Sequence, residues 1–275
     1  MYFDKPPLVE LIAELRWLPV AAPVGNGQQS QLQIPAAIFA ALGRTSEHLY
    51  MRFAGLMGAN GFLHSERLMP QGFPALVHKP MYRYSKSGTK PGEPVFQLGP
   101  GIFSAHITPP YKSWDDFRPF VETGVTALLD AREGSEHDLP FTNSTVRYMD
   151  CFTEDFLGGK STAQFVKNVL GIEVTLPGAI SRRVAAGEEI TPAIQLMAPL
   201  PDDRQMDISL ANGQIPTGTG LIMNSSVSSS RTLPADKQIV MQFLDGAHQV
   251  ISDMFVELTT RLHPLMEPRH ESRHV

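Results

Sequence analysis

The strongest constraint on the fold is a long amphipathic segment near the end of the sequence, between Thr232 and Pro264. Thr232 is the candidate N-cap, Pro234 and Asp236 suit a first helical turn, and Pro264 is expected to stop the helix. Apolar side chains recur at helical spacing over about seven turns, namely Ile239, Val240, Phe243, Leu244, Ala247, Val250, Ile251, Met254, Phe255, Leu258 and Leu262. A helix of this kind is not stable alone in water, so a sheet or a second helix must cover its apolar face.

A second helix is expected from Trp114 to about Ala131. Ser113 and Asp116 form a candidate capping box at its start. Its apolar residues again lie three and four positions apart, at Trp114, Phe117, Val121, Val125, Leu128 and Leu129.

Alternating apolar and polar residues predict strands elsewhere in the chain. The first covers residues 8–17, where helical spacing is also present and a helix stays an alternative. Two more fill residues 95–108 and are joined by a turn at Gly99-Pro100-Gly101. Further strands are expected at residues 144–152, 172–177, 193–198, 205–210 and 220–228.

This order of elements predicts an α+β fold with two lobes of mainly antiparallel β-sheet, each covered by a long amphipathic helix. Runs of strands without strict β-α-β alternation argue against a doubly wound nucleotide-binding sheet. The first lobe is expected over residues 1–157, with an irregular insertion at about 21–80 that contains one short helix near residues 35–42. Gly158-Gly159 marks the boundary, and residues 158–275 form the second lobe, where Ser161 or Thr162 caps a short helix ended by Gly171.

Composition limits the classes of function. The chain has 275 residues, of which 42% are hydrophobic, enough for a core without metal or disulfide support. Its 23 Lys and Arg against 28 Asp and Glu give a net charge of −5, which disfavours nucleic-acid binding. Cys151 is the only cysteine, no apolar run approaches the about 20 residues of a membrane span, and the start lacks the pattern of a secretory signal. We therefore expect a cytoplasmic protein without a membrane anchor, disulfide or cofactor.

The sequence His270-Glu271-Ser-Arg-His274 matches the H-E-x-x-H pattern of zinc hydrolases. In such enzymes a helix places two imidazoles on one zinc ion beside a carboxylate base. Here the pattern follows Pro268 and ends one residue before the last one, so a solvated tail is the preferred interpretation. No metal site is assigned, and His270, Glu271 and His274 are kept as candidates.

Other motifs favour structural roles. Gly158-Gly159-Lys160-Ser161 resembles the end of a phosphate-binding loop, but Glu154 stands where the first glycine belongs, which favours a linker and helix cap. Cys151 is expected to pack in the interior. His106 and His248 could be ligands or bases, but each is expected to lie at an interface or to satisfy one hydrogen bond. Asp202-Asp203 is interpreted as a polar turn. The serine-rich residues 225–230, with Arg231, are interpreted as an exposed edge. No catalytic residue is assigned.

Several separated segments resemble a bacterial family of uncharacterised, sporadically distributed proteins. The segments are Pro6 to Arg16, Gln97 to Gly101, Pro110-Tyr111 with Trp114, Val146 to Tyr148, Leu170 to Val174, and Phe243 to His248 with Phe255. The resemblance implies no reaction, cofactor or catalytic residue. A patchy distribution is typical of accessory genes of mobile elements or phage defence. One departure is Asp150, where similar proteins tend to have Asn.

Three functions follow as expectations. The leading one is a non-catalytic protein-interaction or accessory component that presents sheet edges or the outer face of a long helix to a protein partner or to a second copy. The alternative is a small-molecule-binding protein with a cavity between helix and sheet. The third is a zinc-dependent hydrolase through His270, Glu271 and His274.

Overall fold

A computed structural model describes residues 2–19, 36–70, 72–73, 75–88, 90–111, 113–185, 188–216 and 218–269. It confirms the α+β class, with a large antiparallel sheet and several helices. The helices are α1 (Ala36–Ala59), α2 (Trp114–Ala131), α3 (Glu154–Leu157), α4 (Thr162–Asn168), α5 (Gly178–Ser181), α6 (Lys237–Leu258) and α7 (His263–Met266), with 3-10 turns η1 (Gly134–Glu136) and η2 (Thr260–Leu262). The strands are β1 (Tyr2–Phe3), β2 (Leu8–Arg16), β3 (His64–Arg67), β4 (Tyr82–Ser85), β5 (Val95–Gly99), β6 (Ile102–Ile107), β7 (Asn143–Phe152), β8 (Ile194–Leu200), β9 (Arg204–Ile215), β10 (Gly218–Ser229) and β11 (Pro268–Arg269).

The chain divides into two compact units. The α2 unit comprises Leu11–Val146 and Ser228–Gly246, and the β8 unit comprises Met1–Glu10, Arg147–Val227 and Ala247–Val275. This division differs from the two consecutive lobes expected to meet at residues 157 and 158. The physical reason is the length of β2, β7, β10 and α6, each of which contributes residues to both units.

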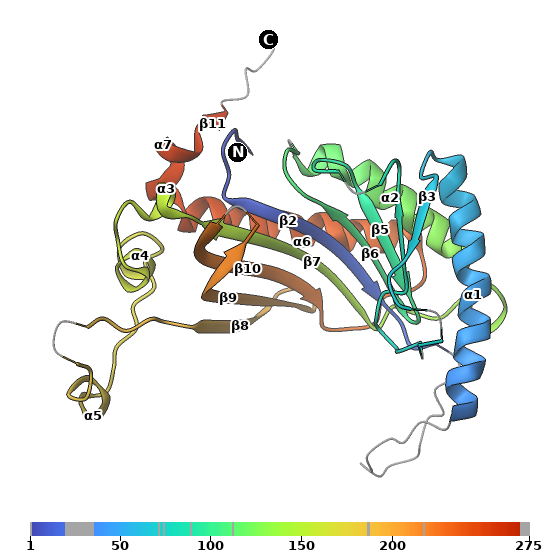
Figure 1. The fold of residues 1–275 in the computed structure, drawn as a ribbon, viewed down its shortest axis with the longest axis horizontal. Coiled ribbons are helices and arrows are strands. Elements are labelled where there is room, and N and C mark those ends of the chain that lie inside the picture. Colours follow the sequence, from blue (N-terminus) through green and yellow to red (C-terminus); the bar gives the residue numbers. More distant parts are fainter. Residues whose placement is uncertain are drawn as a thin grey trace. The chain divides into compact units, whose positions relative to one another are not determined.

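In the α2 unit the strand order is β3-β4-β5-β6-β2-β7, and the pairs from β3 to β2 are antiparallel. Helix α1 packs against α2, β4 and β5, while α2 packs against β6 (Figure 1). The expectation of an irregular insertion at residues 21–80 with one short helix was wrong over residues 36–80, because α1 runs for 24 residues and β3 follows it. Residues 20–35 lie outside the described part.

The predicted turn at Gly99-Pro100-Gly101 and the cap at Ser113 are both present, but the capping box is incomplete. The turn between β5 and β6 needs Gly101, whose φ of 70° is left-handed and whose added Cβ would lie 2.4 Å from the carbonyl oxygen of Trp17. Ser113 caps α2, since its Oγ accepts a hydrogen bond from the Asp116 amide at 3.4 Å. The Asp116 carboxylate accepts from the Ser113 hydroxyl, in place of the reciprocal backbone bond of a full capping box.

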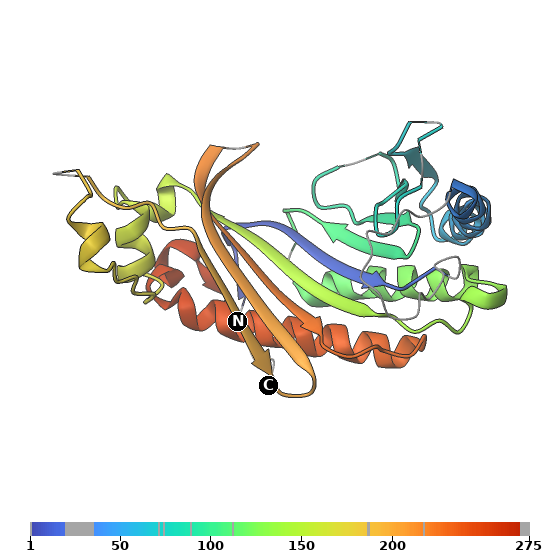
Figure 2. The same cartoon turned by 90° about the horizontal axis from the view of Figure 1, so that it is seen from below.

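In the β8 unit the strand order is β7-β10-β9-β8, and β1 pairs with β11. Figure 2 shows β9 and β10 as two long neighbouring strands, drawn in orange. Their apolar faces belong to a core that also includes α4 and the segment after α6, with buried members Phe152, Phe165, Val166, Leu170, Ile208, Leu210, Leu221, Met223, Leu262 and Met266.

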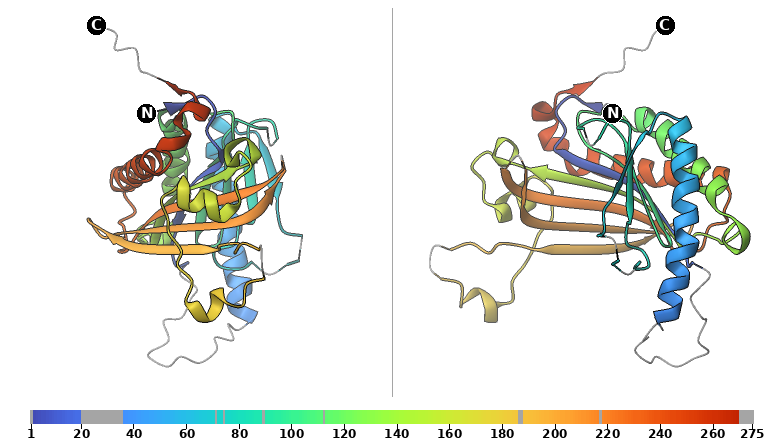
Figure 3. Two further views of the ribbon diagram at one scale, coloured as in Figure 1. Left: turned by 90° about the vertical axis from the view of Figure 1, so that its left-hand side faces the viewer. Right: turned by 45° about the vertical axis from the view of Figure 1, so that its right-hand side comes forward.

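Three predictions for the second half of the chain were wrong. Residues 172–177 form no strand, because this segment is mostly exposed and has no neighbouring strand; with α5 it belongs to a loop that leaves the strands (Figure 3). The last helix begins at Lys237 and not after Thr232, since the Asp236 carboxylate accepts the Ile239 amide at 2.9 Å and is the cap. That helix ends at Leu258, and Pro264 lies in the first turn of the separate helix α7. Among the described helices, none is both long and apolar enough to cross a membrane.

Candidate functional site

Strand β8 lies at the end of the strand order and, within the described residues, pairs only with β9. In Figure 1 it is the outermost of the strands β10, β9 and β8. Its sequence, IQLMAPL, contains no charged residue. Leu196 is 44% exposed and Met197 is 64% exposed. An uncharged, apolar strand edge of seven residues is a surface on which another strand can pair.

The register with β9 shows which side chains of β8 face the core. Leu196 stands opposite Ile208, and Ile194 stands opposite Leu210. Ile208 and Leu210 are buried in the core of the β8 unit, so the even-numbered residues of β8 lie on the same face. The apolar face of the sheet therefore extends as far as β8. The core no longer covers the face there, and Leu196 is half exposed.

Strand β3, at the other end of the strand order, has the opposite character. It has four residues, His64-Ser65-Glu66-Arg67, and all four are exposed. Arg67 lies 3.3 Å from Glu47, and Glu66 lies 3.4 Å from Arg83. Short, charged strands are how proteins usually block unwanted pairing at a sheet edge. The chain therefore protects β3 with charge, whereas β8 has no charged residue and carries only Pro199 as an interruption of its edge.

A group of polar side chains lies on one side of β7 in the β8 unit. The Tyr148 hydroxyl and His248 Nδ1 of α6 share a hydrogen bond of 2.6 Å. Asp150, two residues along β7 and hence on the same side, is only 3% exposed, and burial raises its pKa to about 7. The Asp150 Oδ2 and the Ser225 Oγ are buried without a hydrogen-bond partner in the part of the chain that the structure describes.

In the α2 unit a charged network joins α2 to the first half of α6. Arg118 contacts both carboxylate oxygens of Asp245, and Trp114 Nε1 donates to the same carboxylate at 2.9 Å. Glu122 lies 3.1 Å from Arg118 and 3.2 Å from Lys237. Arg118, Glu122, Lys237 and Asp245 border a hollow of about 490 Å³. Because two cations and two carboxylates already pair there, the network is suited to holding two helices together.

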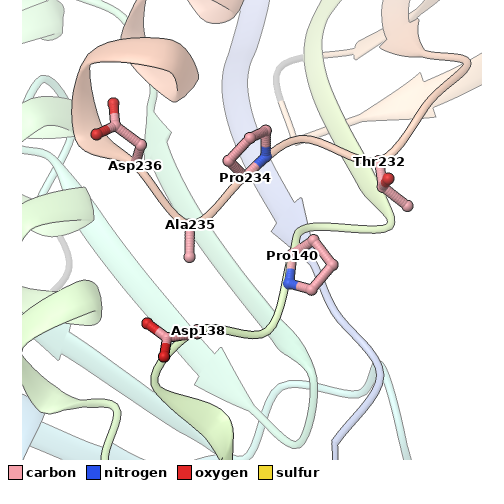
Figure 4. A pocket seen from close by; sticks show the side chains of 6 residues that line it. All are labelled: Asp138, Pro140, Thr232, Pro234, Ala235 and Asp236. Carbon is pink, nitrogen blue, oxygen red and sulfur yellow. The ribbon is translucent and has the colours of Figure 1, made fainter.

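A second hollow, of about 500 Å³, lies between the segment before β7 and the segment before α6 (Figure 4). Two backbone hydrogen bonds between Phe141 and Leu233, of 2.7 and 2.9 Å, join these segments. The lining consists of two carboxylates, one hydroxyl and small apolar groups, from Asp138, Pro140, Thr232, Pro234, Ala235 and Asp236. One of the two acids, Asp236, is already occupied as the cap of α6.

Arg132 is a buried cation in the same unit. It is 1% exposed, and its guanidinium lies 5.2 Å from the ring centres of both Trp17 and Phe141. Burial lowers its pKa to about 10, against the attraction of Glu136. Nη2 donates to the Leu139 carbonyl at 2.6 Å. Arg132 therefore fixes the turn after α2 from within the core.

The predicted metal candidates His270, Glu271 and His274 lie outside the described residues. Within the described part, no group of three or more His, Cys, Asp or Glu side chains is placed to hold a metal ion.

Gly158 to Ser161 form a helix end and a helix cap, as predicted. The Glu154 carboxylate accepts the Gly159 amide at 2.7 Å and so occupies a donor that a phosphate would need. Ser161, and not Thr162, caps α4, in a capping box with Gln164.

The structure also shows where the other residues singled out from the sequence lie. Cys151 is buried, His106 Nε2 lies 2.8 Å from Ser104 Oγ, and Asp202-Asp203 form the turn between β8 and β9. The expectation that residues 225–230 form an exposed edge was wrong over β10. That strand lies between β7 and β9, and Ser225 and Ser229 face the interior at 1% and 7% exposure.

Sequence reasoning predicted the strand at β8 but not its edge position, and it missed the Arg118–Asp245 pair entirely. Compared with models of protein families and with curated proteins, the chain matched none. The resemblance to the sporadically distributed bacterial family stays a prediction.

Proposed function

We propose that this chain is a protein-interaction component that binds a partner protein by adding a strand of that partner to the edge of β8. The observation that carries the proposal is the uncharged edge of β8, with Leu196 and Met197 exposed at the end of an apolar sheet face. In strand addition, main-chain hydrogen bonds supply affinity and alternate side chains supply specificity. The setting in phage defence or a mobile element stays a prediction.

Pro199 indicates which groups of β8 a partner would reach. Proline has no N–H, and within sheets it is found where its nitrogen faces away from the neighbouring strand. Main-chain groups alternate in direction along a strand. The odd-numbered residues Gln195 and Met197 therefore direct their N–H and C=O groups away from β9 and towards an added strand.

The small-molecule alternative has less support. It placed a cavity between a helix and a sheet, whereas the hollow at Arg118 lies between α2 and α6 and the hollow at Asp138 lies between two connecting segments. The zinc-hydrolase alternative rests on residues outside the described part.

The test is to block the edge of β8 without disturbing its bonds to β9. Met197→Pro removes the central outward N–H, and Met197→Val, which keeps that N–H and a good strand residue, is the matched control. Each tagged variant is incubated with an extract of cells that naturally encode the chain. Proteins held by the wild type and by Met197→Val are then purified and added back, while amide hydrogen exchange is followed in β8.

We expect a protein that the wild type and Met197→Val retain, that Met197→Pro loses, and that slows exchange at Gln195 and Met197. Unchanged thermal unfolding of the Met197→Pro variant shows that its fold is intact. Equal retention by all three proteins, or binding without protection of β8, contradicts the proposal.

A further inference from the structure

We propose that the partner at this edge is a second copy of the chain, with the two β8 strands antiparallel about a two-fold axis at Met197. The inference rests on the strand-addition function proposed above and names its partner. Four properties of β8 support it: charge, register, side-chain size and the direction of its main-chain groups.

The first property is the absence of charge. Two-fold symmetry brings the same strand of both copies together, so a charged residue near the axis would meet its own like charge. No residue of β8 is charged, and the central residue, Met197, is a flexible apolar side chain that can pack against itself. The carboxylates of Asp202 and Asp203 lie beyond the strand, in the turn to β9. Asp207, opposite Met197 on β9, accepts a hydrogen bond from Gln195 of the same copy.

The second property is register. Placing Met197 opposite Met197 aligns all seven residues of both strands. A shift by one residue would set even-numbered residues opposite odd-numbered ones and turn the two apolar faces to opposite sides of the sheet. A shift by two residues keeps the faces aligned but loses pairs at the ends. The centred register is therefore the one that pairs all seven residues and keeps both apolar faces on the same side of the sheet.

The third property is size complementarity on the core face. In the centred register, Leu196 of one copy stands opposite Ala198 of the other, so a large side chain meets a small one. Ile194 stands opposite Leu200 of the second copy. Each of these pairs occurs twice by symmetry, which extends the apolar row that now ends at the half-exposed Leu196.

The fourth property is the direction of the main-chain groups. If odd-numbered residues face outward, as Pro199 indicates, the two Met197 residues exchange both of their N–H and C=O bonds at the axis. Gln195 of each copy can donate to the carbonyl of Pro199 of the other. Pro199 itself donates nothing, so the bonds concentrate near the centre of the strand.

Seven residues from each copy bury less surface than a standard permanent interface. We therefore expect a reversible dimer that dissociates on dilution.

The experiment measures the mass of the purified full chain by sedimentation equilibrium from low micromolar concentration to about 100 μM. The variant is Met197→Lys, which places two like charges at the axis. The matched control is Met51→Lys on α1, which makes the same change at a side chain that is 74% exposed.

We expect the wild type and Met51→Lys to rise from 30.3 kDa towards twice that mass, and the dissociation constant of Met197→Lys to increase at least about tenfold. A wild type that stays monomeric at the highest concentration, or a dimer that Met197→Lys leaves intact, overturns the inference. If such a protein still captures another protein in a manner sensitive to Met197→Pro, the strand-addition function stands and only the identity of the partner was wrong. If the protein neither dimerises nor captures another protein in this manner, both proposals fail.

Discussion

The Arg118 guanidinium on α2 holds the Asp245 carboxylate on α6 through three hydrogen bonds, from Nε at 2.8 and 3.0 Å and from Nη2 at 2.9 Å. Trp114 donates a fourth bond to the same carboxylate. Two side chains of α2, Arg118 and Trp114, thus donate hydrogen bonds to the same carboxylate. The contact raises the pKa of Arg118 further, chiefly through its hydrogen bonds to Asp245, so the guanidinium is charged at any ordinary pH.

Removing this acceptor is expected to destabilise the protein. Asp245→Ala leaves Arg118 and the indole of Trp114 without their shared partner, at a cost of about 1–3 kcal/mol for bonds to a charged group. Urea unfolding measures the change. The control is Asp253→Ala on the same helix, because Asp253 is exposed and, among the described residues, bonds only to Gln249 within α6. Equal losses in both variants would contradict the assigned role of Asp245.

Gly124 allows α2 to approach the sheet closely. A Cβ at this position would lie 2.5 Å from Phe96 Cε1 and 2.8 Å from Phe103 Cζ, and both rings are fully buried. Gly124→Ala is therefore expected to destabilise the protein by about 1–3 kcal/mol, despite the better helix propensity of alanine.

Gly58→Ala is the matched control for Gly124→Ala. Gly58 also lies inside a helix, α1, but a Cβ there meets nothing within 4 Å. We expect this variant to gain up to about 1 kcal/mol. Thermal unfolding of the two variants should thus shift in opposite directions, and a shift in the same direction would argue against close packing at Gly124.

Local sequence signals predicted the elements that local physics determines. Helix α2 was found from the cap at Ser113 and the spacing of its apolar residues, because both act within a few turns. Residues 172–177 have an equally good strand pattern and yet form no strand, since a strand exists only with a neighbour.

Sites that depend on long-range pairing could not be found in this way. The edge position of β8 depends on the complete strand order, and Arg118 meets Asp245 across 127 residues of sequence. Helix α1 was largely missed because Gly43, Gly55 and Gly58 and several polar residues interrupt its apolar pattern.

Cys151 is expected to react slowly with thiol reagents in the folded protein. Its side chain is 3% exposed, and burial, with the neighbouring charge of Asp150, raises the pKa of the thiol. At neutral pH little thiolate is present, and reagent reaches it only when the strand opens. Labelling with a chromogenic disulfide should therefore be slow in native buffer and fast in urea. Fast labelling of the native protein would show that β7 is accessible at this position.

Asp150 is expected to make stability fall as pH rises. Its folded pKa of about 7 lies above the ordinary value of 3.8, so the folded protein keeps a proton on this carboxyl that the unfolded chain releases. Between about pH 4 and 7 the unfolded state binds fewer protons, and the free energy of unfolding declines over that range. At about 1.4 kcal/mol for each pKa unit, the total approaches about 4 kcal/mol and is constant above pH 7.

Asp150→Asn removes the ionisable group while keeping its shape. We expect the variant to be more stable than the wild type by a few kcal/mol at about pH 8, with the advantage shrinking towards zero near pH 4. Urea unfolding at several pH values gives this difference directly. Asp253→Asn, at an exposed position, should show no comparable trend. A pH-independent difference for Asp150→Asn would mean that the Asp150 carboxyl is ionised in the folded protein, with a partner or water that offsets its burial.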